Sequence, residues 1–268
     1  MVVWLVLATT TSVRGAEPPA LAKARMLYNA GNYEGAIDAA AVARRLPQAG
    51  DAATLVLARA LLEKYRQSGV PADLVEARDM LVAVHSAALT QRDQVDLLIG
   101  LGQSLYLAET FGAAAELFAL ALSRSALLEQ RDRLMLLDWW ATALDRDAQS
   151  RPPERRSRVF ERITERMEEE LQRDPGSAPA NYWLAVAARG AGDLDGAWSA
   201  AVAAWVRATL SPQSADALRA DLDRLVTQAL IPERARNRPA RDQVDATNAL
   251  RAEWDMIKSQ WKSGPVNP

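Results

Sequence analysis

Cysteine is absent from this chain of 268 residues, and His85 is its only histidine. The absence of thiols excludes disulfides, thiol catalysis and cysteine-ligated iron–sulfur clusters, and a zinc site made of cysteine and histidine has no ligands. The side chain that most often acts as a general base is also missing, unless His85 serves. These shortages predict a protein without a cofactor or metal, and they favour a non-catalytic role.

Neither sign of charge dominates the chain, since 32 Lys and Arg residues oppose 34 Asp and Glu residues for a formal net charge of -2. Such a balance produces no global field that would draw the protein onto nucleic acid or anionic lipid. No nucleic-acid partner is therefore expected. The hydrophobic share of 49% is sufficient for a substantial core and too high for a disordered chain.

The longest apolar run lies at the start of the chain. Met1 to Ala8 is almost wholly apolar, and a cut after Gly15 would leave a polar, proline-bearing terminus. This pattern is typical of a secretory signal peptide over residues 1–15, which predicts a periplasmic or secreted protein. No Lys or Arg precedes the run, so a buried N-terminal segment of a cytoplasmic protein is the alternative. No integral membrane span is expected in the mature chain, because a span needs about 20 apolar residues.

Apolar residues recur at spacings of three and four along most of the chain, and strand-like alternation is absent. This periodicity predicts that nearly all of the fold is helical. Small residues twelve positions apart mark three pairs of helices: Ala24 with Ala36, Gly102 with Ala114, and Ala185 with Ala197. Small side chains are needed where two helix backbones cross closely. The sequence therefore predicts tightly packed helix hairpins.

The hairpins repeat along the chain. An interval of 34 residues separates Ala24 from Ala58, and the same interval separates Ile163 from Ala197. Longer intervals elsewhere are explained by extra residues near 67–73 and 148–157, which contain Gly or Pro and are expected to form turns between helices.

These residues resemble the tetratricopeptide repeat (TPR) family, whose unit is a helix-turn-helix of 34 residues. The clearest match consists of Leu101-Gly102, Leu105, Phe111, Ala114, Phe118 and Ala121. The resemblance implies an all-α, right-handed α-solenoid of about five repeats over residues 17–210. It also implies that the first helix of each repeat lines a concave groove that binds peptides or partner proteins. The expected function is a non-catalytic scaffold or adaptor, in a bacterial envelope complex if the chain is exported.

The groove-facing positions of the family can be carried onto this sequence. They fall on Arg25, Tyr28, Asn29, Arg59, Glu63, Gln103, Tyr106, Tyr182 and Arg189. Tyrosine and arginine are enriched in interaction hot spots, so we expect these residues to contact a protein or peptide partner. The alternative for each is packing against a neighbouring helix. The Lys/Asn pattern with which some family members bind a carboxylate terminus is not reproduced.

Residues 211–268 differ from the repeats and are expected to form a helical cap. A basic, proline-bracketed connector over 231–239 is predicted as a solvated loop, followed by a last helix from Arg241 to about Trp261. Trp254 and Trp261 lie at helical spacing on that helix, and a cap would bury them against the repeats. They could instead form an exposed docking stripe, or join another copy of the chain in a self-assembling homo-oligomer.

Acidic residues offer two further candidates for chemistry. The three consecutive glutamates at 168–170 are explained by ion pairs along their own helix, such as Arg166 with Glu170. Asp145 and Asp147 could act as a catalytic carboxylate pair, provided that they share a buried site with perturbed pKa values.

Overall fold

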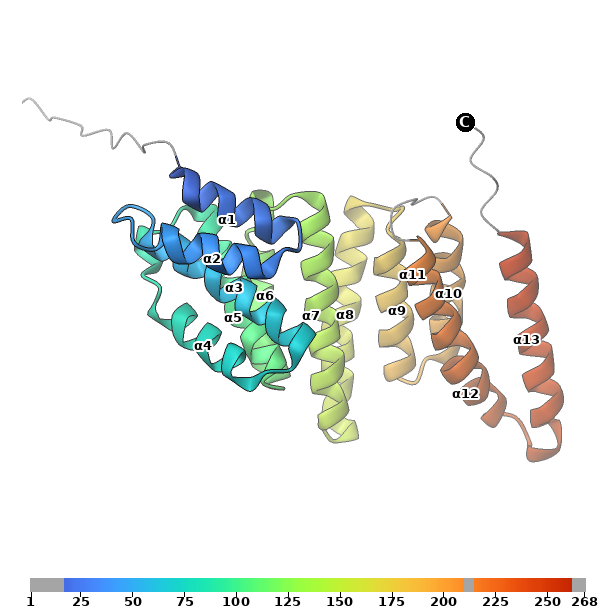
Figure 1. The fold of residues 1–268 in the computed structure, drawn as a ribbon. Helices are drawn as coiled ribbons and strands as arrows, with labels where there is room; N and C mark the ends of the chain where they lie inside the picture. Colours follow the sequence, from blue (N-terminus) through green and yellow to red (C-terminus); the bar gives the residue numbers. More distant parts are fainter. Residues whose placement is uncertain (1–16, 210–214, 262–268) are drawn as a thin grey trace, which may run out of the picture. The chain divides into compact units, whose positions relative to one another are not determined.

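The computed structural model describes residues 17–209 and 215–261 (Figure 1). Every regular element within these residues is a helix, which confirms the predicted all-α fold. The chain divides into two compact units, residues 1–107 and 108–268. The signal peptide predicted over residues 1–15 lies outside the described residues.

The first unit is a stack of consecutive helices. They are α1 (Pro19–Asn29), α2 (Tyr33–Ala43), α3 (Gly50–Ser68), α4 (Pro71–Ala83) and α5 (Gln91–Leu107), with a short 3-10 turn at Ser86–Ala88. Each helix packs on the next one in the sequence, and α3 also contacts both α1 and α5. The odd-numbered helices therefore lie side by side, as in an α-solenoid.

The second unit continues in the same manner. Its helices are α6 (Phe111–Leu122), α7 (Gln130–Ser150), α8 (Pro153–Arg173), α9 (Ala178–Gly190), α10 (Leu194–Ala208), α11 (Ala215–Leu225), α12 (Ile231–Arg236) and α13 (Gln243–Gln260). Neighbouring helices from α6 to α11 pack in sequence order, and α9 also contacts α7 and α11. The first helices of the predicted pairs, α7 and α9, thus lie side by side.

Small residues occupy the crossings of paired helices. The residues predicted at the α1–α2 and α9–α10 crossings are all 0% exposed: Ala24, Ala36, Ala185 and Ala197. Gly190, at the end of α9, shows how closely two helices approach, because a Cβ atom there would lie 2.2 Å from the ring of Phe160 in α8. Larger side chains at these places would push the helices apart.

The extra residues expected in turns lengthen helices instead. Only residues 151–152 separate α7 from α8, and only residues 69–70 separate α3 from α4. Pro153 and Pro71 are the first residues of their helices. Proline is accepted at this position because the missing N–H group would have no partner in the helix. These prolines mark helix starts and do not indicate long loops.

The prediction of a solvated loop over 231–239 is also wrong for most of its length. Residues Ile231–Arg236 form α12, which directly follows a π-helical turn at Val226–Leu230. Ile231 and Ala235 are buried, so one side of α12 belongs to the core. Pro232 lies in the first turn of α12, where proline is compatible with a helix.

The terminal helix α13 covers the apolar side of α10. Trp254 of α13 is 1% exposed, and its ring makes edge contacts with Trp198 and Trp205 at centroid distances of 6.0 and 5.3 Å. Its Nε1 donates a hydrogen bond of 2.8 Å to Asp223 in α11. Lys258 donates to the same carboxylate at 2.8 Å. Burial of Asp223 opposes ionisation, but these two hydrogen bonds outweigh it and lower the pKa of Asp223.

The docking hypothesis is therefore wrong for Trp254, whose indole ring is enclosed by the chain itself. Trp261 is 46% exposed, and its carbonyl oxygen accepts a hydrogen bond from Arg219 at 3.1 Å. The two tryptophans differ in exposure because α10 and α11 lie opposite the part of α13 that carries Trp254. Trp261 instead follows the last helical residue.

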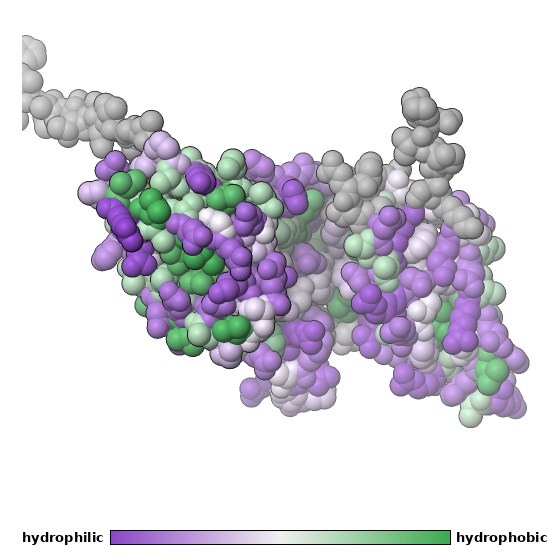
Figure 2. All heavy atoms as spheres, viewed as in Figure 1, coloured by the Kyte–Doolittle hydropathy of each residue, from purple (hydrophilic) through white to green (hydrophobic). Residues whose placement is uncertain are grey.

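Some apolar side chains also reach the surface. On the visible face of the first unit, hydrophobic groups lie among hydrophilic ones (Figure 2). The exposed large hydrophobic residues of this unit are Met26, Val42, Val70, Val75 and Val82. Singly exposed apolar residues are ordinary for a folded protein. Within the described residues, no helix combines the length and the apolar character that a membrane span requires.

Replacing Trp254 by Ala is expected to cost about 3–5 kcal/mol of stability, because it empties a buried aromatic site. Trp261→Ala should cost less than about 0.5 kcal/mol, because that side chain is exposed. Hydrogen exchange of peptides from α10, α11 and α13 measures both effects, and Trp261→Ala is the matched control. Unchanged protection in Trp254→Ala would contradict the capping role of α13.

Candidate functional site

In the first unit, ion pairs join the helices that carry the predicted groove residues. Arg25 in α1 lies 2.8 Å from Asp93, and Arg59 in α3 lies 2.9 Å from Asp96 (Nη–Oδ1 in both pairs). Asp93 and Asp96 are only 2% and 6% exposed and lie near the start of α5. Buried carboxylates need such partners because an unpaired charge is costly away from water. These pairs link α1 and α3 to α5.

Tyr28 and Glu63 extend this set of contacts. The Arg59 guanidinium carbon lies 4.9 Å from the centroid of the Tyr28 ring, in the range of a cation–π contact. Burial raises the pKa of Tyr28, and the nearby charge of Arg59 offsets this only in part. Gln103 in α5 donates a hydrogen bond of 3.2 Å to Glu63 in α3. The structure thus brings together four residues that the sequence assigned to one face.

Most of these groove positions in the first unit are engaged with neighbouring helices. Glu63 and Gln103 are buried, whereas the Arg25 side chain is 28% exposed. Asn29 is exposed at the end of α1, and Tyr106 is half-buried in α5. The contacts of this face chiefly hold α1, α3 and α5 together, which is the packing alternative stated for these positions.

In the second unit, α7 and α9 form the corresponding face around Tyr182. The Tyr182 ring is half-buried and lies 5.3 Å from the Trp183 ring, centroid to centroid. Asp138 in α7 accepts a hydrogen bond of 2.9 Å from Nε1 of Trp183. Asp138 and Asp145 precede Tyr182 and Arg189 by 44 residues each. These residues therefore occupy equivalent positions in two successive helix pairs.

The carboxylates near Tyr182 are only partly neutralised. Burial raises the pKa of Asp138 in spite of its hydrogen bond from Trp183, and burial also raises the pKa of Asp145. Burial, and then the charges of Asp221, Asp138 and Asp145, raise the pKa of Tyr182 to about 12. Side chains of Asp138 and Asp145 nevertheless reach solvent. This face therefore presents negative charge in a partly desolvated setting, which favours a cation.

Arg189, the other predicted groove residue on α9, is bound to the terminal segment. Its Nη2 lies 2.6 Å from Oε1 of Glu233 in α12, and its Nε lies 3.0 Å from Oε2. These hydrogen bonds raise the pKa of Arg189. A guanidinium held by two bonds to one carboxylate is strongly oriented. Arg189 therefore joins α9 to α12, and its charge still lowers the pKa of Asp145 in part.

The hypothesis of a catalytic pair at Asp145 and Asp147 gains no support from the geometry. Asp145 accepts a hydrogen bond from Gln149 at 2.7 Å, and Asp147 forms an ion pair with Arg151 at 2.6 Å. Residues two positions apart on a helix do not face each other. Each carboxylate thus has a separate partner, at the end of α7 or just beyond it, and Asp145 belongs to the face around Tyr182.

The glutamate run also has a different partner from the predicted one. Glu170 is 3% exposed and binds both terminal nitrogens of Arg133 in α7, with 2.7 Å between Nη2 and Oε1. Arg166 instead pairs with Glu169 at 3.1 Å. The spacing within α8 reveals neighbours on that helix alone, whereas Glu170 faces α7. This bidentate pair joins α7 to α8.

Sequence reasoning missed Asp93, Asp96 and Asp138 as members of these faces. The sequence did contain a sign of the role of Asp138, because Asp138 holds the same position in its helix pair as Tyr182 holds in the next pair. Asp93 and Asp96 were not among the positions carried over, because they lie in the first two turns of α5, before Gln103 and Tyr106. Their role depends on the cations that α1 and α3 bring to them.

No protein-family model matches the chain, and a search of curated proteins finds no similar sequence. Within residues 17–209 and 215–261, no group of three or more His, Asp or Glu side chains is arranged to hold a metal ion. The two helix faces described above are therefore defined by their geometry and charge alone.

The raised carboxyl pKa values predict an unusual dependence of stability on pH. The folded chain binds the protons of Asp138 and Asp145 more tightly than the unfolded chain, so stability falls as the pH rises from the ordinary carboxyl range through the folded pKa values. Replacing both residues by Asn should therefore stabilise the protein at pH 7, by a few tenths of a kcal/mol for such accessible groups.

Thermal unfolding at pH 7 and near pH 3.5 measures this gain, which should disappear at the acidic pH. The control variant Glu161→Gln/Glu168→Gln removes two exposed charges from α8 and should show no such pattern. A double Asn variant that is less stable than the wild type at pH 7 would contradict the electrostatic description.

Proposed function

We propose that the protein is a non-catalytic scaffold or adaptor of the TPR type, a right-handed solenoid of about five repeats. It binds a protein or peptide partner on the face formed by the first helices of its repeats. The observation that carries this proposal is the arrangement of Asp138, Asp145 and Tyr182 on α7 and α9. Carboxylates whose pKa values are raised in the folded chain lower its stability when they are ionised. Residues that lower stability in this way are common in binding sites.

The chemistry of this face favours a partner segment that contains Lys or Arg. A cation beside Asp138 and Asp145 would stabilise their ionised carboxylates, whose ionisation burial opposes. The half-buried Tyr182 ring offers an aromatic surface to the same cation. In this proposal the first unit supports the scaffold and does not bind the partner through its cations. Arg25 and Arg59 are already paired, and these pairs hold α1 and α3 on α5. Trp254 serves its own chain, so no self-assembling role is proposed for α13.

A random-peptide phage library panned on the immobilised full-length chain tests the proposed function. Selected peptides should be rich in Lys or Arg, and Asp138→Asn/Asp145→Asn should weaken their binding about tenfold or more, since close interfacial charge pairs contribute about 1.5 kcal/mol or more. The variant Glu161→Gln/Glu168→Gln makes the same change in net charge and should bind as the wild type does. Failure to select peptides, or equal losses in both variants, would reject the proposal.

The proposal also places the protein in the periplasm of a bacterium or outside the cell, as part of an envelope complex. Its support is the apolar run from Met1 to Ala8 and the small residues Val13 and Gly15, which precede a cut after Gly15. N-terminal sequencing of the protein from a bacterial expression host is expected to start at Ala16. A mature chain that retains the first 15 residues would favour the cytoplasmic alternative.

A further inference from the structure

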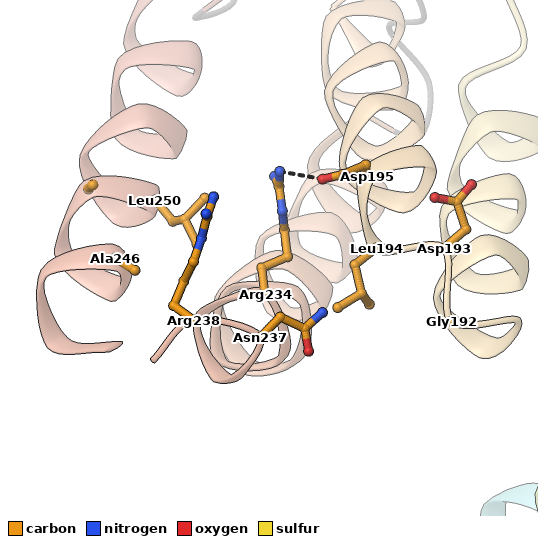
Figure 3. Close-up of a pocket in the computed structure, with 10 residues that line it drawn as sticks. Gly192, Asp193, Leu194, Asp195, Arg234, Asn237, Arg238, Ala246 and Leu250 are labelled. Carbon is orange, nitrogen blue, oxygen red and sulfur yellow. Dashed lines mark hydrogen bonds and ion pairs between the residues drawn. The ribbon is translucent and has the colours of Figure 1, made fainter. Parts of the chain in front are cut away.

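A pocket of about 540 Å³ in the second unit lies between the start of α10, the end of α12 and the N-terminal half of α13 (Figure 3). Its lining includes the apolar side chains of Leu194, Ala246 and Leu250 beside the polar side chains of Arg234, Asn237 and Arg238. None of these residues belongs to the face around Tyr182, so the function proposed above leaves the pocket unexplained.

Most of the charges that line the pocket already have partners. Asp193 caps α10, since its Oδ1 accepts a hydrogen bond of 2.9 Å from a backbone N–H of the first turn. Arg234 pairs with Asp195 at 2.6 Å, and its guanidinium carbon lies 4.9 Å from the centroid of the Trp198 ring. Arg238 is exposed and forms no ion pair with the described residues. The two arginines and two aspartates of the lining balance in charge, and Arg238 is the lining cation without an acidic partner in the described part of the chain.

Glu233, the acidic neighbour of Arg234 in the sequence, does not neutralise the arginines of this pocket. Glu233 is held by Arg189 at 2.6 Å and does not line the pocket. The side chains of Arg234 and Arg238 extend in the same direction, and Asn237 lies between their bases (Figure 3). The two guanidinium groups thus present hydrogen-bond donors along one wall with aliphatic groups beside them, while the Asn237 amide points toward Leu194 (Figure 3).

We propose that this pocket binds a small organic anion, namely a carboxylate that carries a short aliphatic body. Arg238 binds the carboxylate, because charge-assisted hydrogen bonds to guanidinium are strong and directional. Leu194 and Leu250 contact the aliphatic body, as in most pockets for small ligands. Asp195 competes for Arg234, but its side chain is 88% exposed, so a ligand carboxylate can replace it at little cost.

Titration of the 15N-labelled full-length protein with N-acetylleucine, followed by NMR, tests this inference. Saturable shifts are expected for the side-chain amide of Asn237 and for backbone amides near residues 193–196 and 246–250. The neutral N-acetylleucinamide and the cationic leucinamide should produce no such shifts, and inorganic phosphate should bind more weakly because it has no aliphatic part. Stronger shifts with leucinamide, or equal affinity for phosphate, would overturn the assignment.

Two variants with a matched control sharpen this test. Arg238→Ala should weaken N-acetylleucine binding about tenfold or more, because a charge-assisted hydrogen bond is lost. Arg236→Ala removes an exposed arginine at the end of α12, which bonds the Pro232 carbonyl and does not line the pocket, and this variant should bind as the wild type does.

Asp195→Asn removes the competing carboxylate and should tighten binding by about two- to fivefold, the range expected for an exposed ion pair. Since Arg238 and Asp195 are exposed, their variants should keep the wild-type spectrum away from the pocket. Wild-type affinity in Arg238→Ala, or weaker binding in Asp195→Asn, would overturn the proposal. Neither result affects the acidic face around Tyr182.

Discussion

The close approach of neighbouring helices at alanine and glycine is the constraint on which the other features of this protein depend. Ala185 and Ala197 are fully buried where α9 crosses α10, and Gly190 leaves no room for a side chain against Phe160 of α8. Helix axes can approach closely only where side chains are this small. The crossings fix the relative positions of the helices within each unit, and so they place the polar residues of one helix at bonding distance from those of the next.

The polar faces built on this framework differ between the two units. In the first unit, Arg59 is matched by the buried carboxylate of Asp96, and the contact mainly stabilises the packing of α3 on α5. In the second unit, Arg189 is bound to Glu233 of α12, and burial keeps the pKa values of Asp138 and Asp145 raised although the charge of Arg189 lowers that of Asp145 in part. The terminal segment therefore influences the proposed binding face as well as covering α10.

Prediction from the sequence succeeded where a feature depends on residues along one helix. The helical period and the alanine pairs located the hairpins, and the shared register grouped Tyr28, Arg59 and Gln103. The turn predicted within 148–157 is present but occupies only residues 151–152, because Pro153 is accepted as the first residue of a helix. The partner of Glu170 was wrong because spacing within α8 cannot reveal Arg133 of α7. Asp93 and Asp96 were missed for the same reason.

The sequence by itself determined that the chain is all-α, that its helices pair at small residues, and that an amphipathic helix follows the repeats. Only the tertiary structure decided that Trp254 is enclosed while Trp261 is exposed, and that Arg238 lines a pocket. The physical reason is that helical periodicity specifies the direction of a side chain around its own axis. The group that lies opposite depends on the axial position and rotation of another helix, which follow from packing of the whole unit.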